Sequence, residues 1–467
     1  MTAAPGEPDA APAYWCEHAW LPSGVVGSVR IEVADGRISA VQPGTAPQDG
    51  DQRLAGLVLP GFANAHSHAF HRALRGRTHD RGGTFWTWRT QMYAVASRLD
   101  PDSYLALARA VYAEMALAGV TCVGEFHYLH HAPGGARYDD PNAMGHSLVQ
   151  AAADAGIRLT LLDTCYLSAG LSADGYAPLD EQQQRFGDGD ADGWAARVSS
   201  LRAAAHSPDG TLDGSPHARP GAAIHSVRAV PADQLGTVAD LAAASGPHGW
   251  PLHVHLSEQP AENEACLQTH GMTPAQLLYE HGVLGHQTTA VHAVHLSPDD
   301  VTLLGRTRTA VCACPSTEAD LADGIGPFAE LSVAGSSLCL GSDQHAVVDL
   351  LGEAQLLEQH QRLRSGQRGL LTPAALLHSL TAEGHRALGW DDAGALAPGQ
   401  RADLVGIRLD SVRTAGSHFG QVVMSAAATD VHAVVVDGLP VVTDGVHRLG
   451  DVGAMLAAAI EPLWEDQ

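Results

Sequence analysis

The sequence predicts an α/β protein whose main unit is a (β/α)8 TIM-like barrel, joined to a small β-sandwich domain built from both termini. Three observations predict this fold class. The chain has 467 residues, which is more than one ordinary core contains. Eight short apolar runs alternate with helical patterns through its middle, as βαβ units require. Both ends carry β-branched runs separated by turn signals such as Asp-Gly.

The small domain is predicted from segments at opposite ends of the chain. Residues 27–44 alternate apolar and polar side chains around an Asp-Gly turn, which is typical of a β-hairpin: GSVRIEVADGRISAVQPG. Residues 401–409 and 432–445 repeat this pattern with the runs RADLVGIRL and HAVVVDGLPVVTDG. We therefore expect residues 1–58 and 391–467 to form one β domain with a terminal helix, and residues 59–390 to form the catalytic barrel.

The eight expected barrel strands are, in order, LVLPGFANAHSH, TCVGEF, RLTLLDTCY, GAAIHSVR, WPLHVHLSE, TTAVHAVHL, TAVCACPST and SLCLGSD. Helical patterns such as residues 102–119 and 231–245 lie between successive strands, and they begin near Asp or Pro and end near Gly. The Gly/Asp/Ser-rich stretch from about Ser168 to Pro220 is too long for a plain connection. We expect it to lie over the active-site mouth, with a helix in its middle at DGWAARVSSLRAAA.

Charge and composition exclude several classes of function. The formal net charge of −25 argues against nucleic acid or an anionic membrane as a partner, because both require a basic surface. No run approaches the ~18 to 20 apolar residues of a membrane span, and the start lacks a secretory pattern, so a cytoplasmic protein is expected. The seven scattered cysteines are expected to be buried thiols. The chain has no lysine, which excludes Schiff-base catalysis and a carbamylated-lysine metal bridge.

Polar residues at the ends of four expected strands predict a metal site, because barrel enzymes carry their catalytic groups at the C-terminal ends of strands. The first strand ends in His66 and His68, and residues two apart share one face of a strand. An isolated pair at this spacing is more often structural than metal-binding. The fifth, sixth and eighth strands complete the pattern with His255 and Glu258, His292, and Asp343.

This residue set suits one divalent ion. Imidazole nitrogens and a carboxylate favour Zn²⁺, and Fe²⁺ or Mn²⁺ also fits them. Such an ion lowers the pKa of water to about 7, and a nearby carboxylate relays the proton to the leaving group. Glu258 is the candidate for this relay. In the alternative interpretation these groups only form hydrogen bonds with one another and bind no metal. That alternative requires several buried polar residues at the functional end of a barrel.

On these motifs the chain resembles the amidohydrolase superfamily. PGFANAHSHAF is similar to its first-strand motif, APGQRADLV to its return into the small β domain, and HVHLSEQ to the signature of its mononuclear deaminase branch. The resemblance implies that Glu258 shuttles protons, that His292 polarises the substrate, and that Asp343 also orients the attacking water. It further implies four metal ligands: His66, His68, His255 and Asp343.

Within that branch the chain is most similar to the N-formimino-L-glutamate deiminases of histidine degradation, on HSHAFHRALRG, TFWTWRTQMY, GEFHYLHH, HSVRAV and CPSTEADLADGIGP. The resemblance implies that the glutamate portion of the substrate contacts Arg89, Tyr128, His225 and Arg228. Arginine forks bind carboxylates bidentately, which fits a small dicarboxylate. His71 stands where that family often has glutamine, and we expect it to contact the substrate and to add a pH dependence near neutrality. His345 is expected either to contact substrate or to support a ligand.

The function expected from this resemblance is hydrolysis of N-formimino-L-glutamate to N-formyl-L-glutamate and ammonia, by a homodimer that the resemblance alone implies. Two alternatives stay open. One is a deaminase of guanine, an adenosine derivative or N-formimino-aspartate. A pocket that binds a nucleobase would need flat stacking surfaces rather than converging arginines. The other is a catalytically silent barrel that serves as a scaffold, against which the full ligand set with Glu258 argues.

Overall fold

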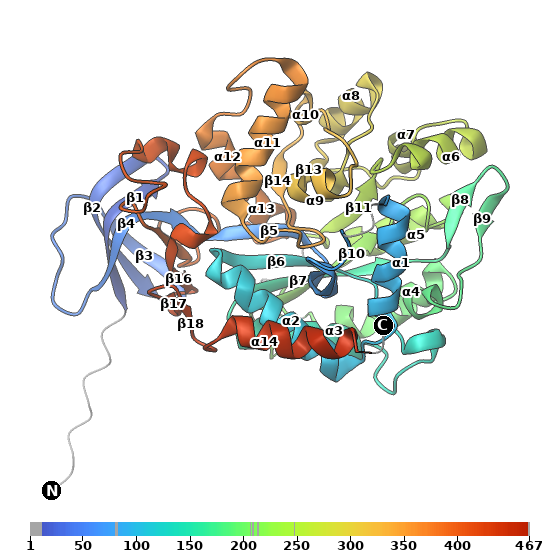
Figure 1. The fold of residues 1–467 in the computed structure, drawn as a ribbon, viewed down its shortest axis with the longest axis horizontal. Helices are drawn as coiled ribbons and strands as arrows, with labels where there is room; N and C mark the ends of the chain where they lie inside the picture. Colours follow the sequence, from blue (N-terminus) through green and yellow to red (C-terminus); the bar gives the residue numbers. More distant parts are fainter. Residues whose placement is uncertain are drawn as a thin grey trace, which may run out of the picture.

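A computed structural model describes residues 12–465 apart from 80–82, 206, 208–209, 213 and 247. Two eight-stranded sheets and one two-stranded sheet make up its strands. Figure 1 shows the barrel with helices around it and the second large sheet to one side. The predicted α/β class, with a barrel and a separate small β domain from both termini, is confirmed.

The barrel strands follow one another in chain order and are all parallel. Their bounds are β5 (Phe62–Ser67), β6 (Val120–His127), β7 (Arg158–Cys165), β10 (Ala218–Ile224), β11 (Leu252–Leu256), β12 (Thr288–His292), β13 (Ala310–Ala313) and β14 (Leu338–Leu340). The circle closes between β14 and β5. There the backbone N–H of Asp343 donates to the carbonyl of His66, and the N–H of His68 donates to the carbonyl of Asp343, at 3.0 and 3.1 Å.

The first expected strand is divided between the two large sheets. Its residues 57–60 belong to β4 (Gln52–Pro60), which pairs with β1 and β15 outside the barrel. Gly61 lies at the junction, where a Cβ atom would meet side-chain atoms of Thr121 and Asp403 at 2.3 and 2.7 Å. The chain changes sheets at a glycine because a side chain would collide there.

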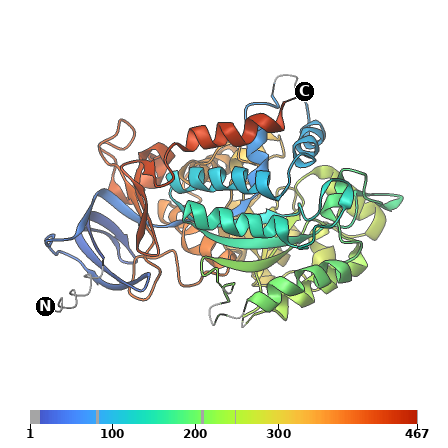
Figure 2. The same cartoon turned by 90° about the horizontal axis from the view of Figure 1, so that it is seen from below.

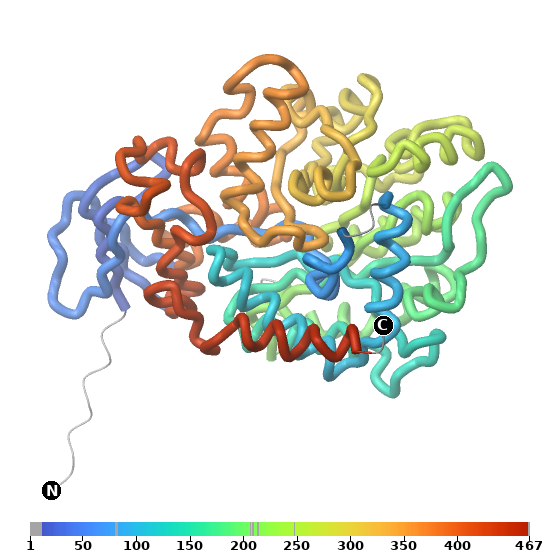
Figure 3. The backbone as a smooth tube through the Cα atoms, viewed as in Figure 1, coloured from blue at the N-terminus to red at the C-terminus, as the bar shows by residue number. Residues whose placement is uncertain are grey.

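The second sheet has the order β18-β17-β16-β15-β4-β1-β2-β3, and Figure 3 shows its blue and red segments lying together. The bounds are β1 (Ala13–Leu21), β2 (Gly24–Ala34), β3 (Arg37–Gln42), β15 (Leu404–Ile407), β16 (Val431–Val436), β17 (Leu439–Thr443) and β18 (Val446–His447). The sheet curls back on itself, because Arg37 forms a β-bridge with Arg401 just before β15. Both expected hairpins are present, and β1 is a strand that the sequence did not predict. The domain boundaries at residues 58 and 390 stay a prediction.

Helices surround the barrel, and Figure 2 shows α14 lying along α2. Their bounds are α1 (Phe85–Ala96), α2 (Pro101–Leu117), α3 (Ala143–Ala155), α4 (Ala191–Ala204), α5 (Ala232–Ala243), α6 (Pro260–His270), α7 (Pro274–Glu280), α8 (Pro298–Thr307), α9 (Pro315–Asp320), α10 (Phe328–Ala334), α11 (Leu350–Ser365), α12 (Pro373–Leu380), α13 (Ala382–Ala387) and α14 (Val452–Ile460). Local sequence sets their starts: Asp100 caps α2 by accepting the Ser103 N–H at 2.8 Å, and Pro101 follows. Within the described residues, none of these helices has the length and apolar content needed to cross a membrane.

The long segment after β7 begins with a small hairpin of β8 (Gly170–Ser172) and β9 (Gly175–Ala177). It continues through the 3₁₀ turn η3 (Gln183–Phe186) to α4, which is the helix predicted in its middle. The remaining 3₁₀ turns are η1 (Ala69–Leu74), η2 (Pro133–Gly135), η4 (Phe419–Met424), η5 (Ala428–Asp430) and η6 (Glu461–Leu463). All seven cysteines are free and buried, as expected.

Candidate active site

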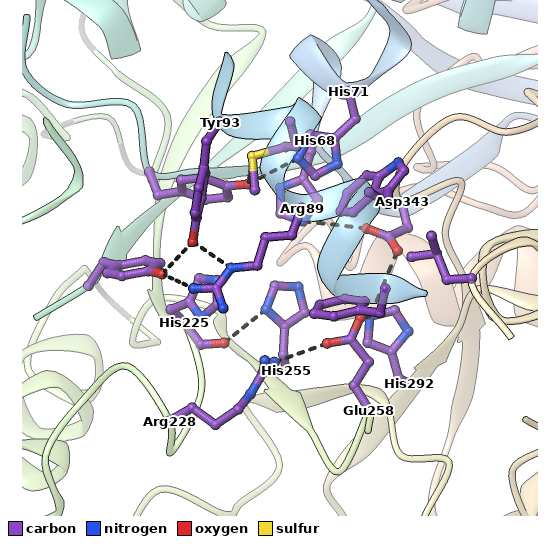
Figure 4. Close-up of a pocket in the computed structure, with 16 residues that line it drawn as sticks. His68, His71, Arg89, Tyr93, His225, Arg228, His255, Glu258, His292 and Asp343 are labelled. Carbon is purple, nitrogen blue, oxygen red and sulfur yellow. Dashed lines mark hydrogen bonds and ion pairs between the residues drawn. The ribbon is translucent and has the colours of Figure 1, made fainter. Parts of the chain in front are cut away.

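The predicted metal ligands meet at the C-terminal ends of three barrel strands, β5, β11 and β14, and Figure 4 labels three of them. Nε2 of His66 lies 3.3 Å from Oδ1 of Asp343 and 3.1 Å from Nε2 of His255. Nε2 of His68 lies 3.4 Å from the same Asp343 oxygen. All four side chains are buried. Nitrogen and oxygen atoms from strands far apart in the sequence therefore face one another in a small space.

His292, at the end of β12, adds a further imidazole. Its Nε2 lies 3.8 Å from Oδ2 of Asp343 and 3.7 Å from Oε1 of Glu258. Two groups that share Asp343 have candidate ligand atoms within 4.8 Å of one another: His66, His255, His292 and Asp343, and His68, His71 and Asp343. The geometry thus offers more imidazoles around Asp343 than the predicted set of four ligands contains.

The hydrogen bonds of two imidazoles fit a cation between these groups. Nδ1 of His68 lies 2.9 Å from the carbonyl of Phe126, and Nδ1 of His255 lies 2.9 Å from the carbonyl of His225. A carbonyl only accepts, so both Nδ1 atoms carry the proton and both Nε2 atoms present a lone pair. One lone pair faces the carboxylate of Asp343 at 3.4 Å, and a cation bound between these two electron-rich groups would relieve their repulsion. The residues present therefore fit a divalent ion.

The protonation states of the ligands also suit a metal. Burial lowers the pKa of His66 to about 3, so its imidazole is neutral at physiological pH. Burial raises the pKa of Asp343, but its hydrogen bond with His66 and the nearby imidazoles outweigh this and hold that pKa well below its ordinary value. A neutral imidazole and an ionised carboxylate are the forms that bind metal ions.

The backbone is strained where two strands deliver these side chains. His292 at φ 69° and Asp343 at φ 44° lie in the left-handed region, which residues other than glycine adopt infrequently. Such conformations cost about 1–3 kcal/mol each and cluster at functional sites. Both residues line the same pocket at the barrel mouth.

Glu258 follows β11 and is held by an arginine. Nη2 of Arg228 donates to Oε2 of Glu258 at 3.0 Å, and Nε of Arg228 lies 3.0 Å from Oε2 of Glu262. The other oxygen of Glu262 accepts the backbone N–H of Ser257 at 2.9 Å. Arg228 therefore orients the carboxylate of Glu258, and the carboxylates of Glu258 and Glu262 together balance the positive charge of Arg228. Sequence reasoning assigned no role to Glu262, which lies in α6 four residues after Glu258.

The five predicted substrate-binding residues line one pocket. They are His71, Arg89, Tyr128, His225 and Arg228, and the same pocket is lined by Glu258, His292 and Asp343. Arg89 lies in α1 and lines the same pocket, and Figure 4 shows its side chain pointing toward Tyr93. In contrast to Arg228, Arg89 pairs with no carboxylate among the described residues. Its guanidinium donates instead to the hydroxyls of Tyr93 and Tyr166 and to the carbonyl of Ala169.

His71 differs from its expected behaviour in one respect. Its Nε2 lies 3.0 Å from the hydroxyl of Tyr128, and its side chain lines the pocket. Burial lowers the pKa of His71 well below its ordinary value. The expected titration near neutrality is therefore wrong, because the desolvated imidazole stays neutral there.

His345 supports the ligand-bearing segments and does not line the pocket. Its Nε2 lies 3.0 Å from Oγ of Ser67, and its Nδ1 lies 3.2 Å from Oγ of Ser342. Ser67, between the two predicted ligands of β5, donates to Oε2 of the buried Glu125 at 2.6 Å. Asn64 donates to Ser342 Oγ at 2.7 Å. These contacts tie the end of β5 to the segment that carries Asp343.

Replacing Ser67 with alanine is expected to destabilise the protein by about 1–3 kcal/mol, because buried polar atoms of Glu125 and His345 lose their partner. Urea denaturation of the two proteins measures this difference. Ser332→Ala, at an exposed position of α10, is the matched control and should change stability by no more than about 0.5 kcal/mol. Equal stability of the two variants would show that Ser67 does not hold these segments together.

A third cluster of candidate ligand atoms lies apart from the pocket and comprises His127, His130 and Asp163. Both carboxylate oxygens of Asp163 already accept N–H groups of Arg197, at 2.7 and 2.9 Å. The guanidinium occupies the place of a cation there, so this cluster is a structural ion pair.

Residues 57–441 match the Amidohydrolase family. The chain belongs to the amidohydrolase family. Residues 13–55 of this amidohydrolase, which contain β1 to β3, match the N-terminal domain of formimidoylglutamate deiminase HutF. The predicted membership of the superfamily is thus confirmed over nearly the whole chain.

This amidohydrolase is 37% identical to formimidoylglutamate deiminase of Pseudomonas aeruginosa, with 93% of this chain and 95% of that protein covered. It is 30% identical to 8-oxoguanine deaminase of the same organism, with 91% and 92% covered. Among solved structures, an amidohydrolase from Brucella melitensis is 32% identical, with 97% and 99% covered and a TM-score of 0.88. An adenosine deaminase from Xanthomonas campestris with bound zinc shares the fold, with a TM-score of 0.80 at 22% identity and 97% of each chain covered.

Proposed function

We propose that this amidohydrolase hydrolyses N-formimino-L-glutamate to N-formyl-L-glutamate and ammonia. The observation that carries this proposal is a pocket that holds metal-type ligands, Glu258 and Arg89, and Arg89 has no carboxylate partner among the described residues. A half-buried guanidinium that contacts only neutral acceptors favours a ligand that brings its own carboxylate. The similarity to formimidoylglutamate deiminase supports the same substrate.

The proposed metal ligands are His66, His68, His255 and Asp343, with zinc as the ion. A divalent ion bound there would activate water and polarise the formimino carbon. Oε1 of Glu258 lies 3.7 Å from Nε2 of His292, so both groups face the same point of the pocket. We assign to Glu258 the transfer of a proton from water to the departing nitrogen, and to His292 the hydrogen bond that stabilises charge on the substrate.

The other pocket residues bind and orient the substrate in this proposal. Arg89 holds a carboxylate, and His225 and Tyr128 contact the glutamate portion. His71 and Tyr128 are joined at 3.0 Å, so they act as one polar unit. Arg228 contacts the substrate while it keeps Glu258 in place, which links substrate binding to proton transfer.

Ammonia release from a panel of substrates tests the proposal. The panel contains N-formimino-L-glutamate, N-formimino-L-aspartate, guanine and adenosine, each with and without a chelator. We expect selective turnover of the first compound, its loss on chelation and its return when zinc is added. Turnover of guanine or adenosine alone would replace the proposed activity with that of a nucleobase or nucleoside deaminase. No turnover of any compound by the metal-loaded protein would favour a silent scaffold.

Replacing Arg89 with methionine is expected to lower kcat/KM for N-formimino-L-glutamate by roughly 30- to 1000-fold. Methionine keeps much of the side-chain length but removes the charged donors, and losing a buried partner of a charge typically costs about 2–4 kcal/mol. Steady-state kinetics measures the effect. Arg98→Met, near the far end of α1 and outside the pocket, is the control and should leave kcat/KM unchanged. A value for Arg89→Met equal to that of the control would remove Arg89 from substrate binding.

A cytoplasmic homodimer completes the proposal. The acidic chain supports a location away from anionic membranes, and the assembly follows from the family resemblance alone. Light scattering after size-exclusion chromatography tests the assembly, with a mass of about twice 48.7 kDa as the expected result.

A further inference from the structure

Four side chains form a hydrogen-bonded cluster at one end of the pocket, and we name it the phenol cluster: Arg89, Tyr93, Tyr166 and Gln183. Nε of Arg89 donates to the hydroxyl of Tyr93, and its Nη2 donates to the hydroxyl of Tyr166 at 3.2 Å. Figure 4 shows Tyr93 and Arg89 pointing toward each other. The two tyrosines and Arg89 line the pocket, while Gln183 lies behind them, buried in η3.

The orientation of the Gln183 amide follows from its backbone neighbour. Oε1 of Gln183 lies 3.1 Å from the backbone nitrogen of Asp180. A backbone N–H only donates, so the amide atom that faces it is the oxygen. The amide nitrogen therefore faces the two phenols, where Nε2 lies 2.9 Å from the hydroxyl of Tyr93 and 3.1 Å from that of Tyr166.

Each phenol oxygen thus receives two N–H donors, one from Arg89 and one from Gln183. A hydroxyl has two lone pairs, so both are used and the O–H proton must point elsewhere. The two hydroxyl oxygens lie 3.5 Å apart, so at most one O–H can point toward the other oxygen. At least one phenol proton is therefore directed away from the cluster. Burial raises the pKa of Tyr93, so this phenol keeps its proton.

We propose that Tyr93 and Tyr166, oriented by Gln183, determine specificity by donating O–H hydrogen bonds to the substrate carboxylate that Arg89 holds. The proposal rests on the proposed function, in that the substrate carries a carboxylate at this end. A carboxylate can accept hydrogen bonds from the Arg89 N–H groups and from both tyrosine O–H groups. A carboxamide presents its own N–H₂ to them and leaves donors facing donors, so the cluster selects the acid over the amide.

Gln183→Glu is the first test, because glutamate keeps the size of the side chain and its acceptor for the Asp180 N–H. Its second oxygen accepts phenol protons and adds a negative charge, so the ligand carboxylate loses its donors. We expect glutarate to bind at least about 30-fold more weakly by calorimetry. Gln182→Glu adds the same charge at the exposed neighbouring position and should change binding less than about threefold. Equal dissociation constants for these two variants would overturn the proposal.

Removing the phenol protons separates their role from the charge introduced at Gln183. The double variant Tyr93→Phe/Tyr166→Phe is expected to reduce the preference for glutarate over glutaramide by about 10-fold or more. Tyr138→Phe, outside the pocket, is the matched control and should keep the wild-type preference. Equal weakening of both ligands by the double variant would assign these tyrosines a packing role and overturn the proposal.

Glutarate binding does not require turnover, so the outcome is independent of the proposed reaction. If the wild-type protein binds glutarate but releases no ammonia from N-formimino-L-glutamate, the reaction fails and the carboxylate site remains. If the wild-type protein releases ammonia and the variants bind glutarate with wild-type affinity, the proposed reaction is supported and the proposed role of the phenol cluster is rejected.

Discussion

Replacing Glu258 with glutamine is expected to lower kcat by about 10²- to 10⁴-fold while the bound metal is retained. Glutamine has nearly the same shape and keeps an oxygen that accepts from Nη2 of Arg228, which donates to Glu258 at 3.0 Å. It cannot accept a proton from water, so the proton transfer to the leaving nitrogen is lost. Steady-state kinetics together with metal analysis of the purified variant measures both parts of the prediction.

Glu264→Gln is the matched control for this variant. Glu264 lies in α6, six residues after Glu258, and its side chain is exposed. The control should retain wild-type kcat. A Glu258→Gln enzyme that turned over at the wild-type rate with its metal bound would exclude proton transfer by this residue. Loss of metal from that variant would instead indicate that Glu258 stabilises the ion.

Replacing Asp343 with asparagine is expected to lower both the metal content and kcat/KM, the latter by about 10³-fold or more. The Asp343 carboxylate lies 3.3 and 3.4 Å from the nitrogens of His66 and His68, and it supplies negative charge to a set of neutral imidazoles. Asparagine keeps the shape but removes that charge. Charge stabilisation by a metal amounts to several kcal/mol, and about 1.4 kcal/mol corresponds to tenfold in rate.

Metal analysis and kinetics of Asp343→Asn, before and after dialysis against zinc, test this expectation. Asp391→Asn removes the same charge at an exposed position and should bind metal as the wild type does. Full metal content together with full activity in Asp343→Asn would contradict the ligand set proposed for this site.

Seven of the eight barrel strands could be predicted from the sequence because each is a short apolar run with turn signals beside it. The first strand was the exception. Its expected run crosses Gly61, and the continuous apolar pattern on both sides hides the change of sheet. Strand β1 was missed because Glu17 and His18 interrupt its apolar residues and because it directly follows a Pro/Ala-rich start.

Among the site residues too, some positions could be predicted from the sequence and others could not. His66, His68 and Asp343 lie at or just after the ends of strands, and parallel strands in a barrel bring their carboxyl ends to one rim. Their meeting could therefore be expected from strand order alone. The partners of Arg228 and Arg89 could not, because an arginine in a sequence does not reveal which distant carboxylate or phenol its side chain reaches.

By itself, the sequence determined the alternation of strands and helices, the turn positions and the residues that end each barrel strand. These features depend on periodicity and on glycine, proline and capping residues, which act over a few positions. Only the tertiary structure decided that Glu262 balances Arg228, that His345 supports Ser67, and that Gln183 orients two phenols beside Arg89. Such contacts depend on the directions of side chains from segments that folding brings together, and these directions follow from the packing of the whole barrel.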